Sequence, residues 1–235
     1  MPDAASGLIY YVVFLFSTTL HEAAHAWAAL KGGDPTAYQG GQVSLDPRPH
    51  IKREPFGMVI LPLLTAVASG WPIGFASAPF DPQWAVRHPK RAGWMALAGP
   101  GANVVLLLIA ALLLRLGMSA GVFTAPSSVS FGHIVAASSD GAWTTIGFLL
   151  GAFFSMNLVL ATLNLLPLPP LDGSTAVTLL LHDDRAARYQ EWLMGPGRAL
   201  AIVGMLVAWQ LFGYVFRPVF LIAVNLLHPG MNYGG

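Results

Sequence analysis

The chain has 235 residues, of which 55% are hydrophobic and 10% are charged. Soluble chains carry about 25% charged residues, so this composition excludes an ordinary soluble protein and indicates a single integral membrane domain over residues 1–235. The formal net charge of +1 gives no reason to expect a nucleic-acid partner. Because the chain has no cysteine, a metal site would have to use histidine, aspartate, glutamate or water.

Residues 8–31 form the first apolar segment, and they are numerous enough to cross a bilayer as a helix. The segment carries no charge before His21, and it ends at Lys31, just ahead of two glycines that favour a helix end. The residues before Leu8 include no basic group. We therefore expect this first segment to be retained as a membrane anchor rather than cleaved as a signal peptide.

The first apolar segment contains the motif His21-Glu22-Ala23-Ala24-His25. In a helix, side chains four residues apart lie on one face, so both imidazoles can bind the same Zn²⁺. Glu22 lies beside them and can act as a general base toward water. Since ionisable side chains are costly inside a membrane helix, we interpret the three residues as a metal site rather than as packing.

Polar, turn-rich residues follow at 32–55. Within them, the alternation of Gln42-Val43-Ser44-Leu45 ahead of Asp46-Pro47 predicts a short edge strand over residues 42–46. Two interpretations of this stretch stay open. It is either a plain connecting loop or a strand edge near the metal that pairs with an extended peptide.

The distribution of basic residues bears on how the chain threads the membrane. Loops 31–55, 77–91 and 183–198 carry most of the lysine and arginine, whereas loop 117–140 carries none. Basic loops tend to lie on the cytoplasmic side. The apolar residues 56–76 are interrupted by proline and glycine, so they either cross the membrane or re-enter it. Loop charge favours re-entry, because it keeps both flanking basic loops on one side.

Three further apolar stretches, at 92–116, 141–166 and 199–227, predict membrane helices. The sequence therefore predicts an all-α polytopic membrane protein. It should have about five to six membrane helices or re-entrant segments, with a short β-hairpin or edge strand after the first helix. Asn103 is a lone amide within an apolar run. It should either hydrogen-bond to another helix or face the metal site.

A third metal ligand is expected, because hydrolytic zinc sites usually have three protein ligands. Asp172 follows Pro167, Pro169 and Pro170, which break the helix between two apolar stretches. Such a break lets polar backbone enter the membrane, so Asp172 is the best-placed carboxylate. The other interpretation is that Asp172 caps a helix over residues 173–182.

Three motifs in this order resemble the site-2 proteases, which are polytopic intramembrane zinc metalloproteases. The HExxH motif is at 21–25, Ala-Gly-Pro-Gly-Ala-Asn is at 98–103, and the NxxPxPxLDG segment is at 164–173. The resemblance covers most of the chain. No stretch has room for an inserted PDZ domain or a pair of CBS domains, so the chain looks like the minimal branch of that family.

The resemblance implies that His21, His25 and Asp172 hold one Zn²⁺ per chain, with Glu22 as the general base. It implies that Asn103 assists catalysis by hydrogen bonding to the oxyanion or to the substrate backbone. The expected activity is hydrolysis of peptide bonds within or near transmembrane segments. The expected substrate is a single-span membrane protein such as an anti-sigma factor. The expected location is the bacterial inner membrane, with the active site nearer the cytoplasmic face.

A membrane metal-ion transporter or carrier is the alternative, because it too would place histidines and carboxylates in membrane helices. A carrier would favour ligands along a path through several helices, and it would have no need of Glu22 beside a histidine pair. The remaining histidines lie in predicted loops and helix ends, which counts against such a path: His50, His88, His133, His182 and His228.

Overall fold

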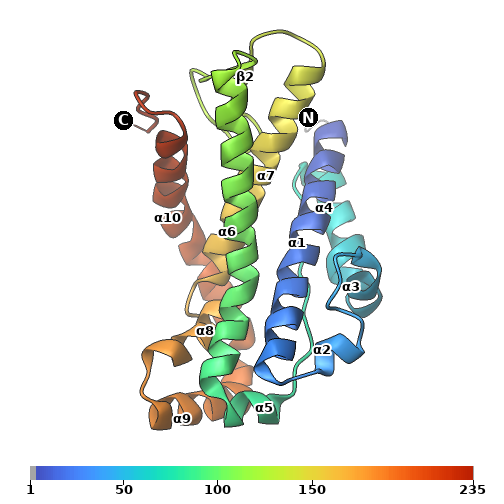
Figure 1. The fold of residues 1–235 in the computed structure, drawn as a ribbon, viewed down its shortest axis with the longest axis vertical. Coiled ribbons are helices and arrows are strands. Elements are labelled where there is room, and N and C mark those ends of the chain that lie inside the picture. The colour runs from blue at the N-terminus through green and yellow to red at the C-terminus, as the bar shows by residue number, and fades with distance from the viewer. Residues whose placement is uncertain (1–3, 235) are drawn as a thin grey trace.

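The computed structural model describes residues 4–234. Four helices in this range are long and apolar enough to cross a membrane, and they run alongside one another (Figure 1). They are α1 (Ala4–Gly32), α6 (Pro89–Ser119), α7 (Ala142–Asn164) and α10 (Ala201–Leu227). These helices confirm the predicted apolar segments and the all-α polytopic membrane fold.

The chain between α1 and α6 forms short elements. They are α2 (Thr36–Gln39), α3 (Pro47–Arg53), a π-helical turn (Phe56–Ile60), α4 (Leu61–Ser69) and α5 (Pro82–Arg87). Residues 70–81 form no helix or strand. In Figure 1 they run from the upper end of α4 down to α5, which lies at the lower end of the molecule.

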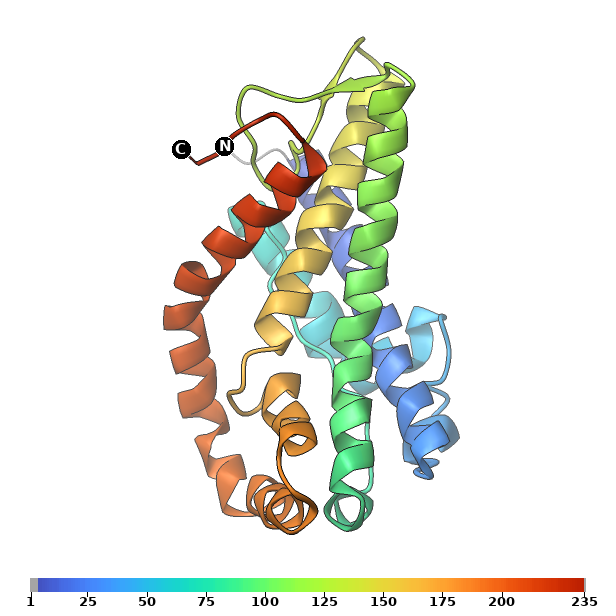
Figure 2. The same cartoon turned by 60° about the vertical axis from the view of Figure 1, so that its left-hand side comes forward.

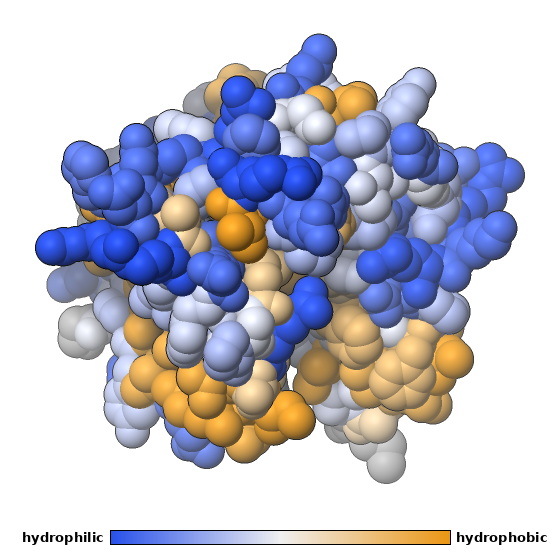
Figure 3. Space-filling model, turned by 90° about the horizontal axis from the view of Figure 1, so that it is seen from below, coloured by the Kyte–Doolittle hydropathy of each residue, from blue (hydrophilic) through white to orange (hydrophobic). Residues whose placement is uncertain are grey.

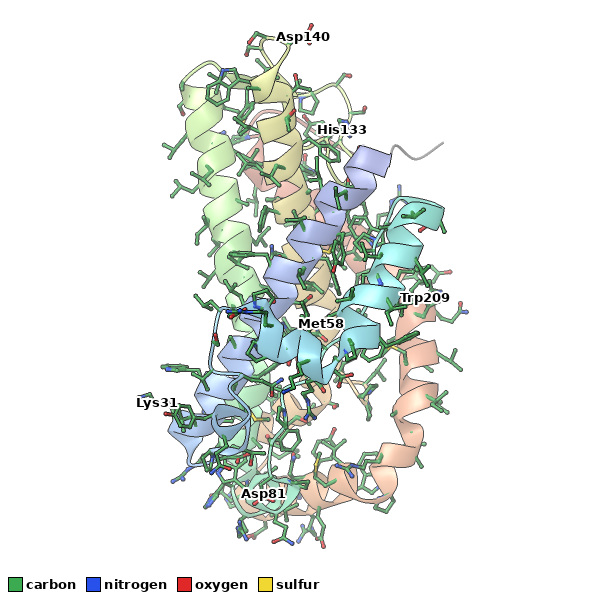
Figure 4. All side chains as sticks on the ribbon, turned by 90° about the vertical axis from the view of Figure 1, so that its right-hand side faces the viewer. Lys31, Met58, Asp81, His133, Asp140 and Trp209 are labelled. Atoms are coloured by element: carbon green, nitrogen blue, oxygen red, sulfur yellow. The ribbon has the colours of Figure 1, made fainter. Side chains whose placement is uncertain are left out.

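Side-chain and backbone contacts show that this segment re-enters rather than crosses. The Ala66 carbonyl lies against Gly7, near the start of α1. From there the chain descends along α1, and the Asp81 amide donates a hydrogen bond to the Asp34 carboxylate, 2.8 Å away, just beyond the end of α1. In Figure 4, Asp81 accordingly lies at the same end of the molecule as Lys31. Residues 56–76 therefore form a hairpin, as the loop charges favoured.

The second half of the chain has the same up-and-down arrangement. α6 rises to a loop that contains a two-stranded antiparallel sheet, and α7 descends from that loop (Figure 2). After α7 come four elements at the lower end and then α10, which rises again. The strands are β1 (Phe123–Thr124) and β2 (Ala136–Ala137), and the four elements are α8 (Asp172–Ala176), a 3-10 turn (Val177–Leu180), α9 (Asp183–Met194) and a second 3-10 turn (Pro196–Leu200).

The lower end of the molecule gathers α5, α9 and the end of α1, whereas His133 and Asp140 lie at the opposite end (Figures 1 and 4). Viewed from below, hydrophilic side chains cover much of this lower end, and hydrophobic side chains gather along one border (Figure 3). Loops 77–91 and 183–198, which are basic, therefore lie at the lower end, and the third basic loop, 31–55, begins there. The loop without lysine or arginine lies at the other end, as the charge rule predicts.

The edge strand predicted over residues 42–46 is wrong. Residues 43–45 form bends. The backbone N–H of Gln42 donates to the Ala37 carbonyl, and the Ser44 hydroxyl accepts from the backbone N–H of Asp46. Asp46 and Pro47 begin a helix instead of ending a strand, because the Asp46 carboxylate accepts the Arg48 amide at the first turn of α3. Local hydrogen bonding replaces strand pairing here.

Candidate metal centre

Three side chains that could hold a metal ion converge between α1 and α8. His21 and His25 lie on one face of α1, and Asp172 is the first residue of α8. Their ligand atoms all lie within 4.8 Å of one another. The two Nε2 atoms are 2.9 Å apart, and the Asp172 Oδ2 atom is 3.1 Å from that of His21 and 3.3 Å from that of His25. The two histidines and the distant aspartate that the sequence suggests as ligands therefore lie together in one cluster.

The break after α7 brings Asp172 to the histidines. α7 ends at Asn164, and residues 165–171 form turns before α8 begins. A side chain at Gly173 would collide with the carbonyls of Leu165 and Leu166, so glycine lets α8 fold back against the end of α7. Leu171 occupies the capping position of α8, and the carboxylate of Asp172 is directed at the imidazoles instead of the helix end.

A buried amide network fixes which nitrogen of His21 carries the proton. The Phe153 carbonyl can only accept, so the Asn157 Nδ2 group donates to it, 2.9 Å away, and also to the Ser17 hydroxyl, 3.0 Å away. Asn157 Oδ1 then accepts from Asn103 Nδ2 at 2.9 Å, which turns Asn103 Oδ1 toward His21. The His21 Nδ1 atom, 2.6 Å from that oxygen, therefore donates, and in the neutral ring its Nε2 keeps a lone pair.

The His25 ring is likewise held by a hydrogen bond, in this case to a backbone carbonyl. Its Nδ1 atom donates to the Met95 carbonyl on α6 at 2.8 Å, so its Nε2 also keeps a lone pair. Two nitrogen lone pairs and a carboxylate oxygen of Asp172 thus point at one another, and the Asp172 Oδ2 atom has no hydrogen-bond donor within residues 4–234. Ligand atoms about 2.0–2.1 Å from a tetrahedral zinc lie roughly 3.3 Å apart. The cluster fits a divalent cation such as Zn²⁺.

Gly99 on α6 leaves room for this cluster. A Cβ atom at position 99 would lie 2.6 Å from the His21 Nε2 atom and would also collide with the His25 Nε2 atom. Any side chain at this position would therefore push the two ligand nitrogens out of place. The glycine gives the backbone of α6 its close approach to the metal centre.

Glu22 lies beside the cluster at the wall of a cavity. The side chain is 5% exposed, and its Oε2 atom has no hydrogen-bond partner in the described part of the chain. The cavity has a volume of about 470 Å³. Its wall includes the three ligands, Glu22, and residues 74–78 of the returning segment. A buried carboxylate without a partner is costly, so this one is suited to act on a molecule that enters the cavity.

The model of peptidase family M50 matches residues 9–204 of the chain, which include His21, His25 and Asp172. The chain belongs to peptidase family M50. This is the site-2 protease family that the three sequence motifs resemble. No solved structure matches the chain.

Two curated relatives illustrate the family membership. The chain is 36% identical over 169 residues to "Putative zinc metalloprotease YwhC" of Bacillus subtilis. The aligned region covers 69% of this chain and 64% of that protein. The chain is 31% identical over 225 residues to "Putative zinc metalloprotease Rip2" of Mycobacterium tuberculosis. Here the aligned region covers 93% of this chain and 75% of that protein. The M50 chain therefore spans somewhat less than two thirds of the length of YwhC.

Asn103 differs in placement from the sequence-based expectation that it contacts the oxyanion or the substrate. Its side chain is fully buried, and both ends of its amide are engaged, one by His21 and one by Asn157. It does not line the cavity. The geometry makes Asn103 a positioning residue for His21, which is the interhelical hydrogen bond that the sequence left open.

Sequence reasoning missed three parts of the M50 site. Asn157 lies in an apolar run like Asn103, and this shared feature could have paired them. Gly99 belongs to the small-residue motif before Asn103, but its contact with the imidazoles depends on helix packing. The extended segment at residues 74–78 has no alternating pattern, so nothing in the sequence marked it as a wall of the cavity.

Proposed function

We propose that this M50 peptidase is a zinc-dependent intramembrane endopeptidase, which hydrolyses peptide bonds within or near the transmembrane segments of membrane proteins. The observation that carries the proposal is the buried, unpartnered Glu22 carboxylate beside three convergent ligands, in a cavity inside a bundle of membrane-length helices. Family membership favours a peptidase over the alternative of a metal-ion carrier.

In this proposal one zinc ion per chain is held by the Nε2 atoms of His21 and His25 and by Asp172. When bound, zinc polarises the scissile carbonyl and makes water more acidic. Glu22 takes a proton from the attacking water as its oxygen adds to the carbonyl carbon. When the C–N bond breaks, Glu22 delivers that proton to the leaving amine. Asn103 and Asn157 keep the His21 ring oriented throughout.

The extended segment at residues 74–78 offers an edge for the substrate backbone. Ala76 and Ala78 form no backbone hydrogen bond to another residue of the described chain, and both line the metal cavity. Residues two apart in an extended chain present their backbone groups to the same side. An unwound substrate can therefore pair with this edge beside Glu22. This edge takes the role that the sequence suggested for residues 42–46.

The proposed substrate is a single-span membrane protein, such as an anti-sigma factor, and the proposed location is the bacterial inner membrane. His21 lies 11 residues before Gly32 at the end of α1, or about 16 Å at 1.5 Å per residue. Two basic loops, 77–91 and 183–198, share that end of the molecule, and loop 31–55 begins there (Figure 1), which supports a site nearer the cytoplasmic face.

The test is zinc content of purified, detergent-solubilised variants, measured beside cleavage of a model membrane substrate. Glu22→Gln should keep about one zinc per chain and lose cleavage, because an amide cannot accept the proton. Asp172→Ala, His21→Ala and His25→Ala should lose both. Loss of zinc in Glu22→Gln with full occupancy in Asp172→Ala would reverse the roles. Zinc transport into proteoliposomes without cleavage of any membrane substrate would favour the carrier.

A further inference from the structure

A groove runs between α1 and α6 on a face of α1 that does not line the metal cavity. Its lower part has a volume of about 490 Å³ and is lined mainly by Trp27, Lys31, Arg91, Trp94 and Leu97. A second hollow of about 430 Å³ shares Trp27 and lies between α1 and residues 43–45, with Ala102 of α6 in its wall. The two hollows are open to the surface and mainly apolar, and two cations lie at the lower end of the first.

The two cations are available to a ligand. The Lys31 side chain makes no hydrogen bond or ion pair with another residue between positions 4 and 234. The Arg91 Nη1 group donates to the Gly32 carbonyl at 3.1 Å, which holds the guanidinium at the end of α1 beside Lys31. The next acidic residue of the chain, Asp34, does not pair with either, because its carboxylate accepts from Thr36 and from the Asp81 amide.

The groove lies at the depth where a membrane changes from hydrocarbon to headgroups. Leu8 begins the apolar segment of α1, whose one acidic residue up to Trp27 is Glu22, and Trp27 lies 19 residues later, or about 29 Å at 1.5 Å per residue. This length matches the hydrocarbon core of about 30 Å. Trp27 is 54% exposed and Trp94 is 66% exposed, as expected for interfacial tryptophans, and Lys31 follows one turn beyond.

We propose that this groove binds one anionic phospholipid, with its phosphate on Lys31 and Arg91 and one acyl chain along Trp27, Trp94 and Leu97. Charge complementarity selects the anionic class. A phosphatidylcholine headgroup would bring its own ammonium group close to the two cations, whereas phosphatidylglycerol would bring only the phosphate. The acyl chain accounts for the apolar remainder of the groove. This inference does not rest on proteolysis, so it stands or falls independently of the proposed function.

The test is native mass spectrometry of the delipidated full chain, titrated with phosphatidylglycerol or with phosphatidylcholine of the same acyl chains. We expect one phosphatidylglycerol per chain, bound at least about tenfold more tightly than phosphatidylcholine. Each interfacial cation contributes about fivefold. Lys31→Gln, which breaks no hydrogen bond of the described chain, should therefore weaken phosphatidylglycerol binding about fivefold. Lys31→Gln/Arg91→Gln should abolish the preference for it.

The matched control is Arg185→Gln/Arg188→Gln, which also removes two positive charges, from exposed positions of α9 at the same end of the molecule. This control should bind phosphatidylglycerol as the unmodified chain does. Three results would overturn the proposal: equal affinity for the two lipids, equal loss of binding in the control and in the Lys31 and Arg91 variants, or binding of glycerol phosphate as tight as that of the lipid. The last result would assign a site for free phosphate.

Discussion

Gly99→Ala should separate metal binding from folding in this chain, because the two effects have opposite signs. Position 99 is buried within α6, where its α-carbon faces the imidazoles of His21 and His25. The added methyl would lie 2.6 Å from the His21 Nε2 atom, whereas an ordinary contact is about 3.5 Å. The His21 ring must therefore shift by roughly 0.9 Å, and the His25 ring, whose Nε2 atom lies closer still, must shift by more.

Zinc sites tolerate ligand displacements of only about 0.2 Å, so this shift should weaken zinc binding by about 100-fold or more. The metal-free protein should not be destabilised, because each ring can tilt about its Nδ1 hydrogen bond and move its Nε2 atom toward the neighbouring cavity of about 470 Å³. Alanine also favours a helix over glycine by about 0.5–1 kcal/mol. We therefore expect equal or higher thermal stability of the metal-free form.

The assay is zinc affinity by competition with a chelator, together with thermal unfolding of the metal-free protein in detergent. Gly101→Ala is the matched control, since it lies two residues away in the same helix and an added Cβ there meets no atom within 4 Å. It should gain the same helix stability and keep zinc. Normal zinc affinity in Gly99→Ala would refute the geometry of the metal centre, and unfolding of its metal-free form would refute a role for Gly99 confined to the site.

Two further predictions concern residues around the ligands. Asn103→Ala should weaken zinc binding about 10- to 100-fold, with a near-normal cleavage rate per zinc-loaded molecule. A loss of about 10²–10³ in that rate at normal zinc affinity would instead support direct contact with the oxyanion. Ala76→Pro removes a backbone donor from the cavity wall, so it should slow cleavage of a membrane substrate by about tenfold without loss of zinc. Ala76→Ser keeps the donor and should cleave normally, and equal rates for the two variants would argue against substrate pairing at this edge.

The membrane helices and the three clustered residues His21, His25 and Asp172 are accessible from the sequence because each has a recognisable local signal. Hydropathy marks the four long helices, since a bilayer requires about 20 apolar residues in a row. The histidine pair is fixed by helix periodicity. Asp172 was identified by a different argument, namely that a proline-rich break lets polar backbone enter the membrane. The structure brings these three residues together.

The structure differs from the sequence-based expectations mainly where a polar group has a choice of hydrogen-bond partners. At residues 42–46 the alternating pattern was only four residues long, and Asp46-Pro47 is equally suited to start a helix, as it does. The segment at residues 74–78 begins with glycine and lies between Pro72 and Pro79, and it has no alternating pattern. Its placement follows from packing, since Gly74 lies against Phe14 of α1. For Asn103, the sequence could not distinguish a bond to His21 from one to a substrate, because both need the same amide.

The metal centre joins parts of the chain that are synthesised far apart in time. Asp172 follows His25 by 147 positions, the difference of 172 and 25. At about 5–20 residues per second, the ribosome needs roughly 7–30 s to cover this distance. During that interval α1 is already made but lacks its carboxylate ligand, and α7 must be in place before Asp172 can reach the histidines. Biosynthetic order thus leaves the three-residue cluster incomplete until most of the bundle has been synthesised, so under the proposed function the growing chain has no complete active site before then.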